Sequence, residues 1–226
     1  MNYKNQILKK IANNTEVVGI IGLGYVGLPL AVNFAEAGIK TLGFDKNLDK
    51  VDRINHGSNY IEDIRDALLK EVVDSVSLSA TTDFTRMKEC DALIIAVPTP
   101  LDRFKKPDMS FIEAACTDIG RYMKPGTFIS LESTTYPTTT EEVMLPIIEA
   151  ASAQNTHWEH EFVPLSEGDE ESARTTEGVP TEGEIPSTRE RGHTNEPPKF
   201  IHGTDFWLAY SPERVDPGNK AFHTRN

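Results

Sequence analysis

Residues 17–45 have the sequence VVGIIGLGYVGLPLAVNFAEAGIKTLGFD, which joins an apolar run, a glycine-rich turn, a helical pattern, a second apolar run and an acid. The run Val17–Ile21 is rich in β-branched residues, and Val26–Ala37 has the spacing of an amphipathic helix. The G-x-G-x-x-G turn between them is weak evidence alone, but it becomes strong between a strand and a helix. This order predicts the βαβ unit of a dinucleotide-binding domain.

Three glycines and one acid define the chemistry expected of this unit. Gly22 permits a tight turn, Gly24 lets a pyrophosphate approach the backbone, and Gly27 lets the helix lie close to the sheet. The phosphates would meet free N–H groups at the positive end of the helix dipole. Asp45 follows the last glycine by 18 residues, where a carboxylate accepts from the adenosine ribose and repels a 2′-phosphate. The pattern favours NAD over NADP; the alternative is an ordinary βαβ unit with a glycine-rich turn.

The composition fits one α/β core and argues against several classes of protein. The chain has 226 residues, of which 38% are hydrophobic, and its net charge of −12 argues against a nucleic-acid partner. Cys90 and Cys116 are too few for a disulfide framework, and the scattered histidines lack metal-ligand spacing. No apolar run approaches the roughly 20 residues of a membrane span, and the polar N-terminal residues are not a signal peptide. We expect a cytoplasmic protein with no metal and no membrane.

Apolar runs and helical patterns alternate along the rest of the chain. Helices are predicted at 47–56, 61–73, 83–88, 110–123 and 139–151, and strands at 76–79, 91–97, 127–131 and 206–210. Ser110 is the predicted cap of its helix, with Glu113 at the capping-box position. This alternation predicts an α/β fold with a doubly wound parallel sheet and helices on both faces, a Rossmann-type domain.

An acidic segment interrupts this pattern. Between Glu159 and Lys199 there are 11 acidic residues, four basic residues and five prolines. Such a segment buries too little apolar surface to offset its ordering entropy, so residues 154–199 are predicted to be a disordered or loosely packed insertion. A role as an acidic docking segment is the alternative. The predicted organisation is a dinucleotide-binding domain at 1–153, the insertion at 154–199, and the last strand of the same domain within 200–226.

Ligands of such a sheet lie beyond the carboxyl ends of the strands. The segments expected there include Pro98-Thr99-Pro100, Glu132-Ser133-Thr134-Thr135-Tyr136-Pro137 and Ser211-Pro212-Glu213-Arg214. Turn chemistry explains each segment taken singly. Together they place hydroxyls, a carboxylate and a guanidinium at one edge of one sheet, which predicts a ligand site.

Four blocks of this sequence resemble the UDP-glucose/GDP-mannose dehydrogenase family: IGLGYVGLPLA, AVPTP, ESTTYPTTTEEV and FWLAYSPERVDPGNK. The wording of YVGLPLA, ESTTYP and SPERVDPGN is most similar to the branch that oxidises UDP-N-acetylglucosamine. The resemblance implies an oxidoreductase of polysaccharide biosynthesis that oxidises the C6 alcohol of a UDP-sugar to a carboxylate with two NAD⁺. It also implies a cysteine thiolate that holds the aldehyde-level intermediate.

The resemblance assigns roles by motif position. The implied cofactor-binding residues are Gly22, Gly24, Tyr25, Val26, Gly27, Asp45, Thr99 and Thr134. Thr134 would also position a water or alcohol oxygen near the nicotinamide, and Glu213 would act in the acid–base chemistry. The implied substrate contacts are Glu213, Arg214 and Val215.

The chain departs from the family in three ways. Asn226 is reached before the family's cysteine block, its central helix and its second nucleotide-binding domain, and Cys90 and Cys116 are predicted to be small core residues. Thr138 stands where the family usually has glycine, and the acidic insertion separates the last helix from the last strand. We expect a truncated or split enzyme; in a split enzyme, a second polypeptide would carry the missing cysteine and sugar-binding half. The alternatives are an inactive NAD-binding interaction module and a hydroxyacid or hydroxyacyl dehydrogenase, which would need a histidine after a later strand.

Overall fold

Six parallel strands form one sheet in the order β3-β2-β1-β4-β5-β6. The computed structural model describes residues 2–101, 103, 105–156, 158 and 200–211. The strands are β1 (Val17–Ile21), β2 (Lys40–Phe44), β3 (Leu78–Thr81), β4 (Ala92–Ile95), β5 (Thr127–Leu131) and β6 (Phe206–Tyr210). This order confirms the predicted doubly wound sheet, and it places the reversal of strand order between β1 and β4.

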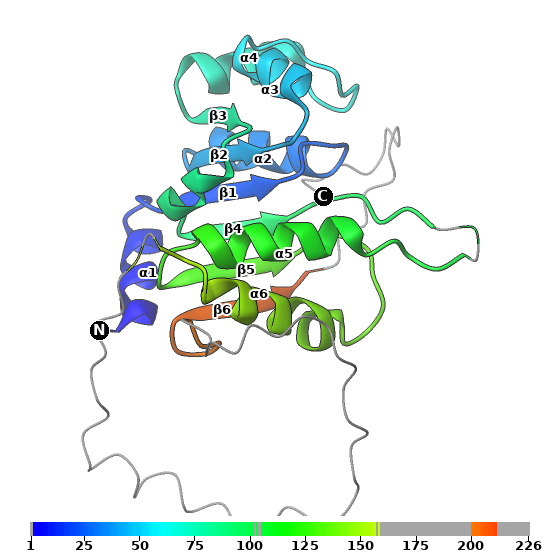
Figure 1. Ribbon diagram of the computed structural model, residues 1–226. Coiled ribbons are helices and arrows are strands. Elements are labelled where there is room, and N and C mark those ends of the chain that lie inside the picture. Colours follow the sequence, from blue (N-terminus) through cyan, green and yellow to red (C-terminus); the bar gives the residue numbers. More distant parts are fainter. Residues whose placement is uncertain (1, 102, 104, 157, 159–199, 212–226) are drawn as a thin grey trace, which may run out of the picture.

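Helices cover both faces of this sheet. They are α1 (Tyr3–Ala12), α2 (Gly27–Glu36), α3 (Leu48–Asn55), α4 (Asp66–Asp74), η1 (Phe84–Glu89), α5 (Ser110–Tyr122), η2 (Thr140–Met144) and α6 (Leu145–Ser152). In Figure 1, α5 and α6 lie in front of the sheet and α2 lies behind it. Successive residues of β1 point to opposite faces of the sheet: Ile20 packs with α2 to α4, and Ile21 packs with α5 and α6.

The N-terminal residues form a helix that the apolar pattern did not predict. Asn2 caps α1 by accepting from the Asn5 amide at 3.0 Å, and Lys10 binds Asp91 at 2.7 Å. No residue of α1 is buried, so its polar sequence carries little apolar signal. Contacts with distant residues, rather than an apolar stripe, attach this helix to the domain.

Several predicted boundaries beyond α3 were wrong by two to five residues. The helix predicted from residue 61 begins at Asp66, because the Asn59 amide donates to the carbonyls of Ile61 (2.8 Å) and Ile64 (2.6 Å). These side-chain bonds hold residues 61–65 in a turn. The strand predicted at 76–79 begins at Leu78, since Val76 has a left-handed φ of 59°.

The predicted capping box of α5 was also wrong. The Ser110 amide donates to Asp108 Oδ1 at 3.0 Å, and Met109 occupies the cap position without a side-chain hydrogen bond. The Glu113 amide donates to the Met109 carbonyl at 2.9 Å. An Asx-type turn at Asp108 therefore replaces the predicted Ser–Glu pair.

The helix predicted at 139–151 consists of two parts. It begins as the π-helical turn η2 and continues as α6, whose second residue is Pro146. Proline has no N–H for the hydrogen bond that a continuous α-helix requires there. The irregular turn directly follows the threonine-rich segment after β5.

Residues on both sides of the acidic segment pack into the domain. Asn155 is buried, and its amide nitrogen donates to the carbonyls of Gly120 (3.3 Å) and Met123 (2.9 Å). Phe200 is also buried, and its backbone amide donates to Ser152 Oγ at 3.0 Å. We therefore propose that the insertion begins after Thr156; residues 159–199 lie outside the described part of the chain.

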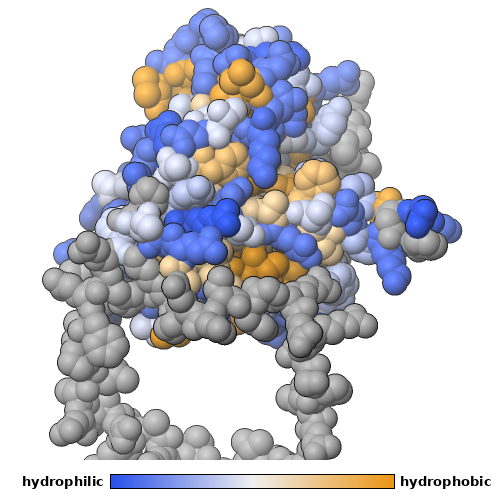
Figure 2. Space-filling view, in the orientation of Figure 1, coloured by the Kyte–Doolittle hydropathy of each residue, from blue (hydrophilic) through white to orange (hydrophobic). Residues whose placement is uncertain are grey.

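The surface of the described residues is mixed in character. Apolar side chains reach it in several separate places, interspersed with polar ones (Figure 2). None of the helices described here is both long and apolar enough to cross a membrane. Among the described residues no group of three or more His, Cys, Asp or Glu side chains could hold a metal ion.

Candidate functional site

The glycine-rich turn joins β1 to α2 at the carboxyl edge of the sheet. Gly22 has a φ of +92°, and its amide donates to the Phe44 carbonyl at 2.8 Å. A Cβ on Gly22 would lie 2.6 Å from the Ala96 carbonyl oxygen, and a Cβ on Gly27 would overlap the Gly22 carbonyl oxygen. The close packing of the turn against the sheet and the start of α2 thus requires glycine at both positions.

Gly24 has a different environment from the other two glycines. A Cβ built on it would meet no described atom within 4 Å, and its φ lies outside the left-handed region. The first turn of α2 also has no side-chain cap, since Val26 occupies the cap position. Open space beside uncapped helix N–H groups is the arrangement that binds phosphate.

Asp45 is held against the turn by the protein's own donors. Its Oδ2 accepts from the Leu23 amide at 3.0 Å and from Lys50 Nζ at 3.1 Å, and its Oδ1 accepts from the Asn47 amide at 2.9 Å. Asn47 in turn caps α3 by accepting from the Asp49 amide at 3.0 Å. The carboxylate is therefore fixed in position at the end of β2, beside the glycine turn.

Tyr60 supports the same turn and was missed by the sequence analysis. Its hydroxyl donates to the Leu23 carbonyl at 2.6 Å, and Arg53 lies 5.1 Å from its ring centroid. Burial, together with the nearby Asp45 carboxylate, raises the pKa of Tyr60. The hydroxyl thus keeps its proton and remains a donor. No local pattern points to this contact, because the two residues are 37 positions apart.

A cavity of about 220 Å³ opens at the ends of β1, β2 and β4. Its lining residues come from the glycine turn, the residues after β2 and β4, η1 and α5: Ile21, Gly22, Phe44, Asp45, Lys46, Lys50, Phe84, Val97, Pro98, Phe111, Ala114, Ala115 and Asp118. Most of these side chains are apolar, and the charged ones lie on the β2 and α5 sides. A concave apolar site with a few polar groups is typical of cofactor binding.

The segments after β4 and β5 are tied to each other at this edge. Thr99 Oγ1 donates to the Thr134 carbonyl at 2.8 Å, and Ser133 Oγ donates to the Val97 carbonyl at 2.7 Å. Thr134 itself is exposed. The structure thus brings Thr99 and Thr134 together, as the parallel strands required.

The buried cysteines do not form part of this edge. Cys90 follows η1, two residues before β4, and Cys116 lies within α5; both side chains are buried. Burial raises the pKa of the Cys90 thiol to about 12, and burial also raises that of Cys116. Neither thiol is available as a thiolate near neutral pH.

Of the implied site residues, Glu213, Arg214 and Val215 lie outside the described part of the chain. The strand before them ends at this same edge, because the Ser211 amide donates to the Leu131 carbonyl at 3.0 Å. Tyr25 is 59% exposed beside the turn, and Val26 is partly buried.

Comparison with known proteins decides the family of the chain. Residues 16–172 match the UDP-glucose/GDP-mannose dehydrogenase family, NAD binding domain. The chain belongs to this family. Its match to the family's NAD-binding domain agrees with the glycine turn, Asp45 and the apolar cavity, and makes NAD the cofactor.

Relatives and solved structures extend this match along the chain. A UDP-N-acetyl-D-glucosamine 6-dehydrogenase of Pseudomonas aeruginosa is 34% identical over 90% of the chain and 36% of the relative. A UDP-N-acetyl-D-mannosamine dehydrogenase of Campylobacter jejuni is 43% identical over 58% of the chain and 32% of the relative. The crystal structure of an NDP-N-acetyl-D-galactosaminuronic acid dehydrogenase from Methanosarcina mazei Go1 superposes with a TM-score of 0.66 and 28% identity, covering 96% of this chain and 38% of that one. The chain thus spans about a third of the length of these relatives.

The threonine-rich segment contains one residue whose backbone conformation favours glycine. Thr138 has a φ of +72°, and its carbonyl accepts from the amides of Glu141 (3.0 Å) and Glu142 (2.8 Å). Thr135 Oγ1 lies 2.8 Å from Thr139 Oγ1 in the same turn. The left-handed conformation costs a β-branched residue about 1–2 kcal/mol, and the hydrogen-bonded turn holds Thr138 in it.

Proposed function

We propose that this chain is the NAD-binding part of a nucleotide-sugar 6-dehydrogenase that oxidises a UDP-sugar, most specifically UDP-N-acetylglucosamine. The observation that carries the proposal is the shared edge on which the open Gly24 turn, the fixed Asp45 carboxylate and the Thr99–Thr134 pair lie. The sugar assignment is supported by the Pseudomonas aeruginosa relative, which is 34% identical over 90% of the chain.

In this proposal the chain's own residues bind and orient the reactants. The amides at the start of α2 bind the pyrophosphate, Asp45 accepts from the adenosine ribose, and Thr99 lies beside the cofactor. Thr134 positions the oxygen to be oxidised, and Glu213 accepts or returns its proton while Arg214 and Val215 contact the nucleotide sugar. NAD⁺, when bound, would supply the acceptor for the hydride that leaves C6.

The thiolate that the family chemistry needs would come from outside these residues. Cys90 and Cys116 are buried, with raised thiol pKa values. We propose that a second half, whether it continues this sequence or is a second polypeptide, carries the cysteine and the remaining sugar contacts. The proposed location is the cytoplasm, where thiols stay reduced.

Cofactor selectivity tests the placement of the site. Calorimetric titration should show tighter binding of NAD⁺ than of NADP⁺, and Asp45→Ala should narrow that preference. Lys50, 3.1 Å from Asp45, remains in the variant and favours a phosphate there. Asp49→Ala makes the same charge change in the first turn of α3 and should keep the preference. Equal affinity of the unmodified chain for both cofactors would contradict the role of Asp45.

Turnover tests the reaction itself. The 226-residue chain alone should release no NADH from UDP-N-acetylglucosamine, whereas adding a separately expressed second half with its cysteine should restore release. Glu213→Gln should then lower the rate by about 10²–10⁴, the usual contribution of general acid–base catalysis. Two NADH released per sugar by the chain alone would overturn the requirement for a second thiolate-bearing half.

A further inference from the structure

The cavity has a second polar wall that the proposed function leaves unused. It is formed by Lys46, the residue after Asp45, and by Asp118 from α5. Lys46 Nζ lies 3.8 Å from Asp118 Oδ2 and 5.7 Å from the centroid of the Phe84 ring. A separation of this length is an ion pair but not a hydrogen bond, so both groups keep their capacity to bind a ligand.

The Asp118 carboxylate is poorly satisfied by the protein. Its side chain is only 21% exposed, and within the described part of the chain Lys46 is its one ion-pair partner, with no hydrogen bond to the carboxylate. A carboxylate in that position gains most from a neutral or positive donor that enters the cavity. The observation therefore points to a ligand with a hydrogen-bond donor at this wall.

The rest of the cavity wall constrains the shape of that ligand. Phe84 lies on the η1 side, Val97 and Pro98 follow β4, and Phe111 and Ala115 come from α5. These apolar groups suit a flat ring, and the Lys46–Asp118 pair adds one donor beside one acceptor. A heteroaromatic ring that presents an acceptor beside a donor would complement the site.

Adenine presents such an edge on its five-membered-ring side, because its exocyclic amine N6 donates while the neighbouring ring nitrogen N7 accepts. A lysine ammonium only donates, and an ionised carboxylate only accepts. We propose that Lys46 and Asp118 recognise this edge of the dinucleotide, with Asp118 accepting from the amine and Lys46 donating to the ring nitrogen. The inference rests on the proposed cofactor site, and it makes this pair the determinant of base specificity.

Replacing adenine by hypoxanthine turns the favourable contact with Asp118 into an unfavourable one. Its ring carries an oxygen acceptor in place of the amine, and that oxygen would face the Asp118 carboxylate. Paired hydrogen bonds to a base edge discriminate by about 1–3 kcal/mol, which is roughly fivefold to 150-fold in affinity. The chain should therefore bind NAD⁺ at least about fivefold more tightly than nicotinamide hypoxanthine dinucleotide.

Calorimetry with these two dinucleotides on the full chain tests the inference. Asp118→Asn should bring the two affinities to within about threefold, because an amide side chain can turn to donate or to accept. Glu113→Gln removes the same charge from the same helix without lining the cavity, so it should keep the native ratio. Thermal midpoints of both variants check that the fold is unchanged.

The outcomes separate this inference from the function on which it rests. Equal binding of both dinucleotides by the native chain, or an unchanged ratio in Asp118→Asn, overturns the role of Asp118 and leaves the cofactor site in place. Failure of NAD⁺ itself to bind overturns the cofactor site, and the base assignment with it. The role of Asp118 in base recognition is supported if Asp118→Asn loses the preference for NAD⁺ over the hypoxanthine dinucleotide and Glu113→Gln keeps it.

Discussion

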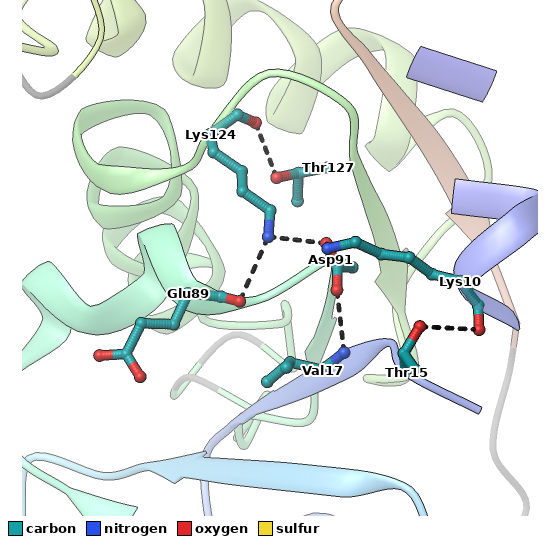
Figure 3. Close-up of polar contacts among 7 residues, drawn as sticks. All are labelled: Lys10, Thr15, Val17, Glu89, Asp91, Lys124 and Thr127. Atoms are coloured by element: carbon teal, nitrogen blue, oxygen red, sulfur yellow. Dashed lines mark hydrogen bonds and ion pairs between the residues drawn. The ribbon is translucent and has the colours of Figure 1, made fainter. Parts of the chain in front are cut away.

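The two edges of the sheet use their polar groups in opposite ways. At the amino edge, Asp91 accepts from Lys10 Nζ at 2.7 Å, from Lys124 Nζ at 2.6 Å and from the Val17 amide at 2.9 Å (Figure 3). At the carboxyl edge, Gly24 faces open space and α2 begins without a side-chain cap. The comparison shows that the lysines and the backbone amide at the amino edge share one protein acceptor, whereas at the carboxyl edge the first turn of α2 has no side-chain acceptor.

The amino-edge cluster also connects elements that are distant in sequence. Lys10 belongs to α1, Asp91 precedes β4, and Lys124 follows α5 and donates also to the Glu89 carbonyl at 3.2 Å. Burial raises the pKa of Asp91, but the hydrogen bonds from Lys10, Lys124 and the Val17 amide outweigh it and leave that pKa below its ordinary value. The cluster therefore stabilises the fold in the ionised form of the aspartate.

The largest loss of stability is expected where the carboxyl edge is tightly packed. Gly27→Ala should lower the free energy of unfolding by more than about 3 kcal/mol, because its Cβ would overlap the Gly22 carbonyl oxygen and neither backbone can move freely. Urea unfolding measures this loss.

Gly24→Ala is the matched control for that substitution. It should change stability by only about 0.5 kcal/mol, since nothing described lies near the added methyl group. It should still weaken NAD⁺ binding, because the methyl group occupies the space expected for the pyrophosphate. Equal destabilisation by Gly27→Ala and Gly24→Ala would contradict the difference in packing between these two glycines.

The next largest effect is expected at the amino edge. Asp91→Ala should lower the free energy of unfolding by about 2 kcal/mol at neutral pH. This is less than the loss expected on breaking a fully buried ion pair, because Lys10 is partly exposed. A lowered carboxyl pKa stabilises the fold above the unfolded pKa, so this contribution should disappear as the pH falls below about 4. Urea midpoints of native and variant chains across that range measure the convergence.

The control for Asp91 is an exposed ion pair of the same chemistry. Lys70 Nζ lies 2.8 Å from Asp74 Oδ2 on α4, with both side chains more than half exposed. Asp74→Ala should lower the free energy of unfolding by about 0.5 kcal/mol or less. A comparable loss of unfolding free energy in Asp91→Ala and Asp74→Ala would show that burial of Asp91 does not strengthen its ion pairs.

A smaller effect, of opposite sign, is expected in the turn after β5. Thr138→Gly should stabilise the chain by up to about 1 kcal/mol, because relief of the left-handed strain exceeds the added entropy of the unfolded chain. Thr140→Gly, within η2, should instead destabilise by about 1 kcal/mol. Thermal midpoints of the two variants should move in opposite directions, and movement in the same direction would contradict the strain assigned to Thr138.

The smallest effect is expected from the acidic segment. Deleting residues 157–199 should leave the thermal midpoint nearly unchanged, because the segment is highly charged and its flanks already meet at Ser152 and Phe200. Extending the deletion to 154–199 should cost about 1–2 kcal/mol, because it removes the two hydrogen bonds of the buried Asn155. Loss of folded protein after the shorter deletion would show that the segment contributes to the domain.

Local patterns were enough to predict much of the fold and part of the site. The strands at 127–131 and 206–210 match the structure residue for residue, because an apolar run bounded by turn residues is a short-range signal. The same signals placed Asp45, Thr99 and Thr134 after their strands, and the parallel sheet brings those strand ends to one edge. The role of Asp45 was predicted from the spacing of the glycine-rich motif, whereas the roles of Thr99 and Thr134 were implied only by the family resemblance.

Contacts between distant residues were decided by the tertiary structure. Helix α1 depends on Lys10 reaching Asp91, 81 positions away, and the glycine turn is held by Tyr60 from 37 positions away. The Lys46–Asp118 wall likewise joins the end of β2 to α5. Periodicity reports which face of an element is buried, but a single polar pair between distant elements leaves no periodic trace. The sequence therefore determined the sheet and its ligand edge, and only folding determined which charges meet across it.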